Sequence, residues 1–378
     1  MKPWNFKTRS VQPIALDIGH DSIKMLQLEI GNGGVRVIAA DKVHMPPEAF
    51  GDESVRRAFV TEQVLRMLDN GSFRGREAVS CLPSDRLHIT SLRLPESETD
   101  EIRQSLRKEM TQRFGLDPDR DMMDYLYAGA VRQAEEVKSE LILFAVDHAT
   151  VESHIEMLES AGLCPVAIDA IPCALFRSFE RSLRRHEDRE RTVVFVDIGS
   201  STTTVVFGDR GEISFVKQIP IAGRRFNCEM AARLGVEVDE VERLREMVRR
   251  DKKNAEVDPS TRQIVIDTIS SIAEELAKEI ALCLRYYTVT FRGVRVEKAF
   301  FTGGEAYESI LINVLKRQLP VKVEVAEPLK GLDLSCGNAH IHFAGDRRSK
   351  LSEWAVAAGL GLKIANRTNT AQPAGMAL

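Results

Sequence analysis

The chain has 378 residues, a length that predicts two or three compact units or two lobes meeting at a cleft. Apolar residues make up 43% of it and charged residues 29%, which are ordinary proportions for a globular protein and exclude fibrous or disordered classes. Lys and Arg number 52 against 56 Asp and Glu, a formal charge of -4. This balance lacks the basic excess of a domain that binds phosphate backbones, so we expect no nucleic-acid partner.

The cysteine and apolar patterns favour a reducing compartment. The six cysteines occur singly, without a CxxC pair or the histidine spacing of a zinc site, so we expect free thiols. The N-terminus is polar and basic rather than a secretory signal, and no run approaches the roughly 18 apolar residues of a membrane span. We therefore expect a cytoplasmic protein.

The first half of the chain predicts an α/β unit with a small α+β insertion. Apolar runs broken by glycine and proline predict strands, and amphipathic spacing predicts helices. The first elements are a strand-turn-strand unit at 14–28, a strand at 35–43, a helix at 54–68 and a strand at 78–82. The insertion follows, with a strand at 88–94, a charged helix at about 100–114, and strands at 125–132 and 140–147. The half ends with a helix at 150–161, a strand at 165–168 and a charged stretch at 179–191 that we interpret as the boundary between lobes.

The second half repeats the opening order of elements. The predicted elements are strands at 193–196, 202–207 and 213–219, helices at 224–233, 238–250 and 264–287, a strand at 297–301, a helix to about 318, and a helix of small residues at 354–364. The helix at 264–287 has an apolar stripe, which we interpret as core packing. The tail from residue 367 is predicted to be disordered.

One motif occurs twice. Asp17-Ile18-Gly19 recurs as Asp197-Ile198-Gly199, and residues 14–22 align with 194–202 without a gap at an offset of 180 (197 minus 17). In each copy a strand ends in a carboxylate, and the glycine turn after it leaves backbone N–H groups free to point at an anion. Two such turns facing each other would clamp a polyphosphate, and the aspartates would hold Mg²⁺ through its waters. A single copy is more often an ordinary hairpin turn, but the pair favours a duplicated nucleotide site.

A second glycine signal lies between the strand at 297–301 and the helix after it. Gly303 and Gly304 would let a flat ligand approach the backbone, although alone this is weak evidence. The chain has no GxxxxGK[ST] pattern, which excludes a P-loop, and no strand-GxGxxG-helix unit that would indicate a dinucleotide site.

The order of these motifs resembles the actin-like ATPases, which include sugar kinases, heat-shock chaperones and the division protein FtsA. Within that superfamily the chain most resembles the PilM family of type IV pilus assembly proteins, also called competence protein A. The resemblance covers roughly residues 12–365. It is carried by the repeated motif with Ser22 and Lys24, the insertion at 87–114, the segment 161–169 and the triplet Ala222-Gly223-Arg224.

The resemblance implies an α/β protein of the actin-like ATPase (ribonuclease H-like) fold: two lobes with a duplicated mixed-sheet core and a small α+β insertion in the first lobe. The implied units are the first lobe core (1–86), the insertion (87–165), the first lobe crossover (166–190), the second lobe core (191–235), its helical subdomain (236–296), the second lobe core with the adenosine motif (297–340), and a C-terminal helix that returns to the first lobe before the tail (341–378).

The resemblance also implies which residues bind ATP and Mg²⁺. The phosphate and Mg²⁺ site would comprise Asp17, Gly19, His20, Asp21, Ser22, Lys24, Asp197, Gly199, Ser200, Ser201 and Thr202. The metal would be held through water by Asp17 and Asp197. The adenosine would be bordered by Gly223, Glu242, Arg245, Gly303, Gly304 and Glu305. Relatives have Lys where this chain has Arg245, and on the residues alone a Glu-x-x-Arg pair is more often a surface ion pair.

One departure from the superfamily bears on catalysis. In the chaperone and actin branches an acidic or amide residue near the crossover between lobes orients the attacking water, whereas this chain has Ile171 before Pro172. Hydrolysis needs a positioned water as well as a charge clamp, so we expect ATP binding with weak or no hydrolysis. Asp169 could substitute if its carboxylate reaches the cleft.

The leading hypothesis is a nucleotide-gated adaptor at the inner face of the cytoplasmic membrane. Its partner would be the N-terminal cytoplasmic tail of a PilN-like inner-membrane protein, bound as an extended peptide near the insertion, with other pilus assembly ATPases as further candidates. The protein would then be peripheral to the membrane through its partner. The alternatives are an FtsA-like polymerising ATPase that tethers a filament, and a small-molecule kinase with Asp124, Asp147 or Asp169 as its base.

Overall fold

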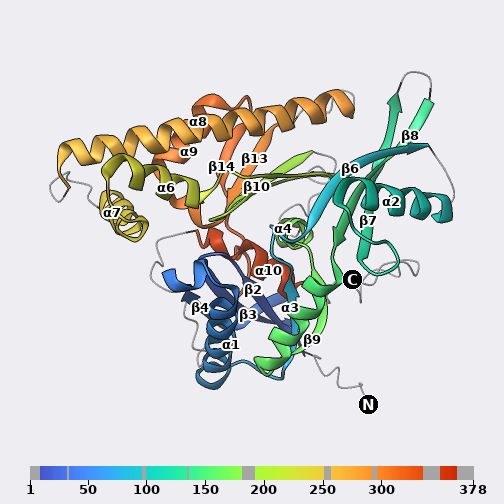
Figure 1. Cartoon of the computed structure of the whole chain (residues 1–378), viewed down its shortest axis with the longest axis horizontal. Coiled ribbons are helices and arrows are strands. Elements are labelled where there is room, and N and C mark those ends of the chain that lie inside the picture. The colour runs from blue at the N-terminus through green and yellow to red at the C-terminus, as the bar shows by residue number, and fades with distance from the viewer. Residues whose placement is uncertain are drawn as a thin grey trace, which may run out of the picture.

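The computed structural model describes residues 9–31, 34–95, 99–133, 136–180, 192–250, 257–291, 296–334 and 350–363. Two mixed β-sheets form the centres of two lobes, and a third, smaller sheet stands to one side of them (Figure 1). The predicted C-terminal tail, and residues 181–191 of the lobe boundary predicted at 179–191, lie outside the described residues.

The first lobe is built on a six-stranded sheet. Its strands are β1 (Ser10–Val11), β2 (Ile14–Ile18), β3 (Ser22–Gly31), β4 (Gly34–His44), β5 (Glu77–Cys81) and β9 (Cys164–Asp169). The central strand β2 pairs antiparallel with β3 and parallel with β5. On the far sides, β4 pairs antiparallel with β3, and β9 pairs parallel with β5. The short edge strand β1, which also pairs with β3, was not predicted.

The second lobe repeats this order of strands. Its sheet comprises β10 (Val193–Ile198), β11 (Thr203–Asp209), β12 (Glu212–Ile219), β13 (Lys298–Thr302) and β14 (Lys322–Val325). β10 pairs antiparallel with β11 and parallel with β13. At the two edges, β12 pairs antiparallel with β11, and β14 pairs parallel with β13. Asp17 and Asp197 both occupy the penultimate position of the central strand. The duplication predicted from the repeated motif is therefore confirmed.

Amphipathic helices cover the outer faces of both sheets. In the first lobe these are α1 (Glu53–Asn70) and α3 (His148–Ser160), and in the second α6 (Gly223–Leu234), α7 (Val238–Arg250), α8 (Pro259–Thr290) and α9 (Ser309–Gln318). Short 3₁₀ helices lie at η1 (Pro47–Phe50), η2 (Gly304–Tyr307) and η3 (Ser352–Trp354). The apolar stripe of α8 is buried with the strands of the second sheet, so the core-packing interpretation is confirmed.

The insertion is a three-stranded sheet with one helix on it. The strand order is β6 (His88–Pro95), β8 (Glu136–Val146), β7 (Met122–Gln133), and the helix is α2 (Thr99–Phe114). Leu92, Leu106, Leu141 and Leu143 form its small core. The expected insertion, 87–165, also included residues 148–165. The structure differs, because α3 buries Leu158 against the first lobe in one cluster with Ile14 and Val64.

Two helices lie between the lobes in the middle of the molecule (Figure 1). They are α4 (Ile171–Glu180) and α10 (Ala355–Gly361), and α10 packs on both α4 and β2. Their close approach requires Gly359, because a Cβ there would clash with the backbone of Ala174. Arg177 of α4 donates from Nη1 to the Gly359 carbonyl of α10 at 2.9 Å, so a hydrogen bond also joins the two helices. α4 was not predicted; Pro172 stands in its first turn, where a missing N–H costs nothing.

A polar cluster joins the insertion to α8 of the second lobe. The buried Glu140 of β8 accepts from Arg93 Nε at 2.7 Å and from the Tyr286 hydroxyl at 3.2 Å. Arg93 also donates to Thr290 Oγ1 at 2.9 Å. Since a buried carboxylate is costly unless it is paired, this contact fixes one point of the insertion on the end of α8.

We predict that acid destabilises the fold partly through His154 of α3. Burial lowers the pKa of His154 to about 4 from its ordinary 6.5, and its Nε2 lies 3.1 Å from Ser80 Oγ. Between these pH values the unfolded chain binds a proton that the folded protein does not, so the free energy of unfolding falls as the pH drops from 6.5 to 4. The shift corresponds to on the order of 3 kcal/mol.

Urea unfolding of the parent and of His154→Gln at a series of pH values measures this contribution. The variant should lose stability less steeply over that range. His88→Gln, at an exposed histidine of β6, is the control and should follow the parent. Equal slopes for the parent and His154→Gln would contradict the prediction.

Candidate functional site

The first copy of the repeated motif forms a buried ion pair. Asp17 on β2 and Lys24 on β3 are register partners, and Lys24 Nζ donates to Asp17 Oδ2 at 3.0 Å. Both side chains are less than 10% exposed. Although burial acts in the opposite direction, the Asp17 carboxylate raises the pKa of Lys24 above its ordinary value. The lysine is therefore a permanent cation at the base of the first turn.

The second copy places another carboxylate at the same centre. Burial and the nearby Asp17 charge raise the pKa of Asp197 to about 7, with Lys24 acting in the opposite direction. Gly303 packs directly against this carboxylate, since a Cβ on Gly303 would stand 2.7 Å from Asp197 Oδ1. Its φ of 92° also favours glycine. The structure thus brings Asp17, Asp197, Lys24 and Gly303 together.

The two glycine turns have the same local geometry. The N–H of Gly19 donates to the Ser22 carbonyl at 2.9 Å, and the N–H of Gly199 donates to the Thr202 carbonyl at 3.2 Å. Ser201 is exposed at the tip of the second turn. The N-terminus of α6 is hydrogen-bonded to that turn, because the N–H of Gly223 donates to the Gly199 carbonyl at 3.0 Å.

The turns from the two lobes also touch. His20 Nδ1 lies 2.8 Å from Asp21 Oδ1 and 3.3 Å from Ser200 Oγ, and its ring stacks on Phe50. Although burial acts in the opposite direction, hydrogen bonds with His20 and Ser200 lower the pKa of Asp21. The two repeated turns therefore face each other across the interface between the lobes.

The predicted adenosine residues form a second group beside Gly223. Arg245 on α7 is 4% exposed and makes a two-point ion pair with Glu305 of η2. Glu242, one turn away on α7, accepts from Asn227 Nδ2 at 3.0 Å. Gly304 begins η2, directly after the Gly303 turn. Arg245 is thus a buried link between helices rather than part of a surface ion pair.

Two contacts at this site had no signal in the sequence. Arg56 of α1 donates to the carbonyls of Gly19 at 2.7 Å and His20 at 3.2 Å, so it ties the first turn to a helix. Tyr307 donates its hydroxyl to Glu353, whose carboxylate lies 3.8 Å from Lys42 Nζ. Arg56 belongs to a charged helix and Glu353 to a short segment, and both residue types are common at protein surfaces. Nothing in the sequence around these two positions therefore marks them as part of the site.

The three candidate bases for a kinase all have structural contacts. Asp147 caps α3 by accepting from the Thr150 N–H at 2.8 Å, and Asp124 accepts from the adjacent backbone N–H of Tyr125 at 2.8 Å. Asp169 accepts from Arg177 at 2.8 Å and lies 3.4 Å from Lys363 Nζ. Pairing with two cations holds the Asp169 carboxylate beside α4 and α10.

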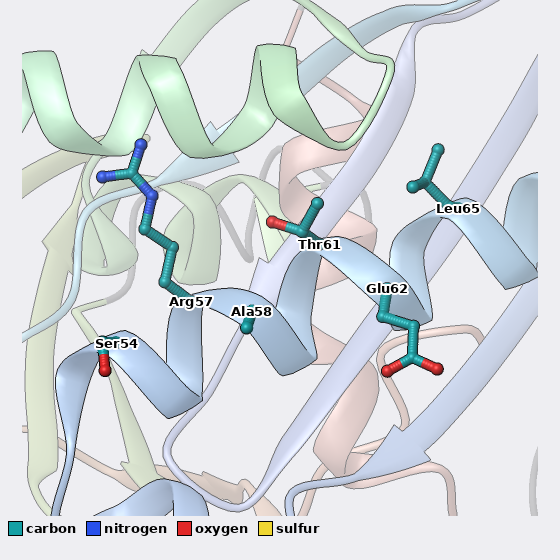
Figure 2. A pocket seen from close by; sticks show the side chains of 6 residues that line it. All are labelled: Ser54, Arg57, Ala58, Thr61, Glu62 and Leu65. Carbon is teal, nitrogen blue, oxygen red and sulfur yellow. The ribbon is translucent and has the colours of Figure 1, made fainter.

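A shallow pocket of about 560 Å³ lies elsewhere, on the outer side of α1 (Figure 2). It is lined by Ser54, Arg57, Ala58, Thr61, Glu62 and Leu65. Arg57 reaches from it to Ser153 and Glu156 of α3, at 3.1 Å in both cases. None of its lining residues belongs to the predicted nucleotide site.

We predict that Arg56 holds the first turn in place. Arg56→Ala removes both donors to the Gly19 and His20 carbonyls, so backbone amides at 18–22 should exchange with solvent about tenfold faster. Hydrogen exchange followed by mass spectrometry measures this rate. Arg66→Ala, at an exposed arginine on the same helix, is the control. Unchanged exchange at 18–22 in Arg56→Ala would contradict the role.

No helix within the described parts of the chain has the length and apolar character needed to cross a membrane. The five cysteines among these residues, at 81, 164, 173, 228 and 283, are free thiols.

Comparison with known proteins identifies the family. Residues 15–365 match the family model of the type IV pilus assembly protein PilM. Among solved structures, the chain is similar to a PilM-PilN type IV pilus biogenesis complex, with 20% identity, 93% of this chain and 98% of that chain covered, and a TM-score of 0.74. It is also similar to the ethanolamine utilization protein EutJ of Carboxydothermus hydrogenoformans, with 14% identity, 93% and 89% covered, and a TM-score of 0.54. The chain thus has the predicted actin-like ATPase fold, and it belongs to the PilM family of type IV pilus assembly proteins.

Proposed function

We propose that this protein is an adaptor of type IV pilus assembly that clamps ATP and Mg²⁺ between its two lobes. The observation that carries the nucleotide part is the meeting of the two repeated turns, with His20 Nδ1 and Ser200 Oγ 3.3 Å apart beside a centre formed by Asp17, Lys24 and Asp197. Turns of this kind direct backbone N–H groups at an anion.

The charges at the centre of the site fit a divalent cation. Asp17 is buried and Asp197 is half-buried, and Lys24 supplies a positive charge that pairs with Asp17. Burial and the nearby Asp17 charge raise the pKa of Asp197 to about 7, and the positive charge of Mg²⁺ would favour the ionised carboxylate. Both aspartates would hold the ion through its waters, as this strongly hydrated cation prefers. Bound Mg²⁺ would neutralise phosphate charge.

The phosphates would lie between the turns 19–22 and 199–202, with Lys24 as the cation nearest the first turn. The nucleoside would lie toward Gly223, Gly303 and Gly304, near the α7 residues Glu242 and Arg245. In this assignment the protein's own groups bind and orient the nucleotide, and the contact between the turns excludes water from the phosphates.

We propose weak or no ATP hydrolysis. The crossover residue before Pro172 is Ile171, which has no group to orient water. The nearby Asp169 is paired with Arg177 and Lys363, which supports a structural role for this carboxylate. Nucleotide binding would then set the relative position of the lobes instead of driving turnover.

Removal of either central aspartate should weaken nucleotide binding. Asp17→Ala and Asp197→Ala should each lower the affinity for ATP by about tenfold or more in Mg²⁺, and by less in EDTA. Titration calorimetry measures both affinities. Asp267→Ala removes an exposed carboxylate from α8 and is the control. The clamp would be refuted if both central variants bound ATP as tightly as the parent.

The proposed partner is the N-terminal tail of a PilN-type inner-membrane protein. Membership of the PilM family supports this assignment, and the similar solved structure with a TM-score of 0.74 is a PilM-PilN complex. The tail would bind as an extended peptide near the inserted sheet. The protein would then lie on the cytoplasmic face of the inner membrane, peripheral through its partner, with other pilus assembly ATPases as further candidates.

A peptide with the N-terminal cytoplasmic sequence of the PilN homologue tests this partner. We expect saturable binding by fluorescence anisotropy, with an affinity that changes when ATP and Mg²⁺ are added, because the nucleotide sets the position of the lobes. A scrambled peptide of equal length and charge is the control. Absence of saturable binding in both conditions would argue against the assignment.

A further inference from the structure

The carboxylate of Glu305 lies directly against Gly223, on the side where a Cβ would stand. A Cβ on Gly223 would clash with Glu305 Oε1 and would stand 3.2 Å from Glu305 Cγ. The space that a glycine leaves free is thus filled by a charged side chain from another element. Gly223 begins α6 directly beside the second turn, where its N–H donates to Gly199. A nucleoside attached to phosphates at that turn would need the same surface.

Arg245 holds the Glu305 carboxylate in this position. Its Nη1 lies 3.2 Å from Glu305 Oε1, and its Nη2 donates to Oε2, so the carboxylate is bound at both oxygens. The guanidinium also donates to Asn227 Oδ1 at 2.7 Å and lies over the ring of Phe226, 5.5 Å from its centroid. Buried two-point pairs of this kind are strong and directional.

The pair joins three separate elements. Arg245 comes from α7, Glu305 from η2, and Gly223 from the start of α6. We propose that the Arg245–Glu305 pair is a latch across the nucleoside end of the site, and that a nucleotide binds only when it displaces Glu305 from Gly223. This inference rests on the proposed nucleotide site and adds that Glu305 opposes binding of the nucleoside.

The surroundings of Arg245 allow the latch to open. Glu308 Oε2 lies 3.6 Å from Arg245 Nη2 and makes no hydrogen bond within the described part of the chain. The hydrogen bond from Arg245 Nη1 to Asn227 Oδ1 does not involve Glu305. When Glu305 leaves, the buried guanidinium therefore keeps one carboxylate and one amide, so release of Glu305 does not leave an isolated buried charge.

The two roles that Glu305 could have, as a latch or as a ligand of the nucleoside, predict opposite effects when its side chain is removed. If Glu305 accepted hydrogen bonds from a bound ribose, its removal would weaken ATP binding. If Glu305 occupies the place of the nucleoside, its removal raises the fraction of molecules that can bind, and the apparent affinity rises with that fraction. In the proposed site the polyphosphate would bind the turns 19–22 and 199–202 and not the face of Gly223 that Glu305 covers, so ligands with a nucleoside should respond more strongly.

The test compares ATP and tripolyphosphate, both with Mg²⁺, by titration calorimetry on the full chain. Glu305→Ser should bind ATP about tenfold more tightly than the parent, while tripolyphosphate should change by less than about twofold. Glu305→Gln keeps the size of the side chain and should tighten ATP binding less. Glu229→Ser is the matched control, because it removes a glutamate from an exposed arginine pair on α6.

Two results would overturn the latch. One is ATP affinity in Glu305→Ser that is equal to or weaker than in the parent, and the other is an equal gain for tripolyphosphate, which would reflect only the loss of a negative charge. Asp17→Ala separates this failure from failure of the nucleotide site. If the parent binds ATP and Asp17→Ala does not, the site stands whatever Glu305→Ser shows; if the parent binds neither ligand, both proposals fail.

Discussion

The buried pair of Lys24 and Asp17 is the interaction on which the site depends. Charged groups leave water only when they are compensated, and here the Lys24 ammonium pairs with the Asp17 carboxylate. Burial and the Asp17 charge raise the pKa of Asp197, so a proton or a cation near this carboxylate is favoured.

The duplicated sheets explain how two distant segments reach that centre. Each lobe presents the end of its central strand toward the other, and the pairing order around β2 repeats around β10. A glycine turn follows each strand, so the same local geometry appears twice with opposite orientation. The lobes differ in what surrounds the turns. In the first, Arg56 of α1 binds the turn, whereas in the second the start of α6 does so. The second turn is thus coupled directly to the helices near Arg245.

Much of the fold could be predicted from the sequence because the motif repeats with a constant spacing, and because strands such as β2 and β10 are short apolar runs that end at glycine. α4 was not predicted from the sequence, although its Pro172 stands in the first turn, which a helix tolerates. The assignment of α3 to the insertion differed from the structure because chain order does not determine which sheet a helix covers. The residues of the site were named from a family resemblance. Their contacts, such as Glu305 on Gly223, join positions 82 residues apart (305 minus 223) and have no local signal.

The contact of Arg93 with the end of α8 gives that helix a mechanical role. α6 lies against α8 near its middle, where Arg225 pairs with Glu275, and the insertion is attached at Tyr286 and Thr290. From Glu275 to Thr290 the helix extends about 22 Å at about 1.5 Å per residue. A tilt of about 10° at α6 would thus move the attachment point by about 4 Å, slightly less than the roughly 4.8 Å between neighbouring strands.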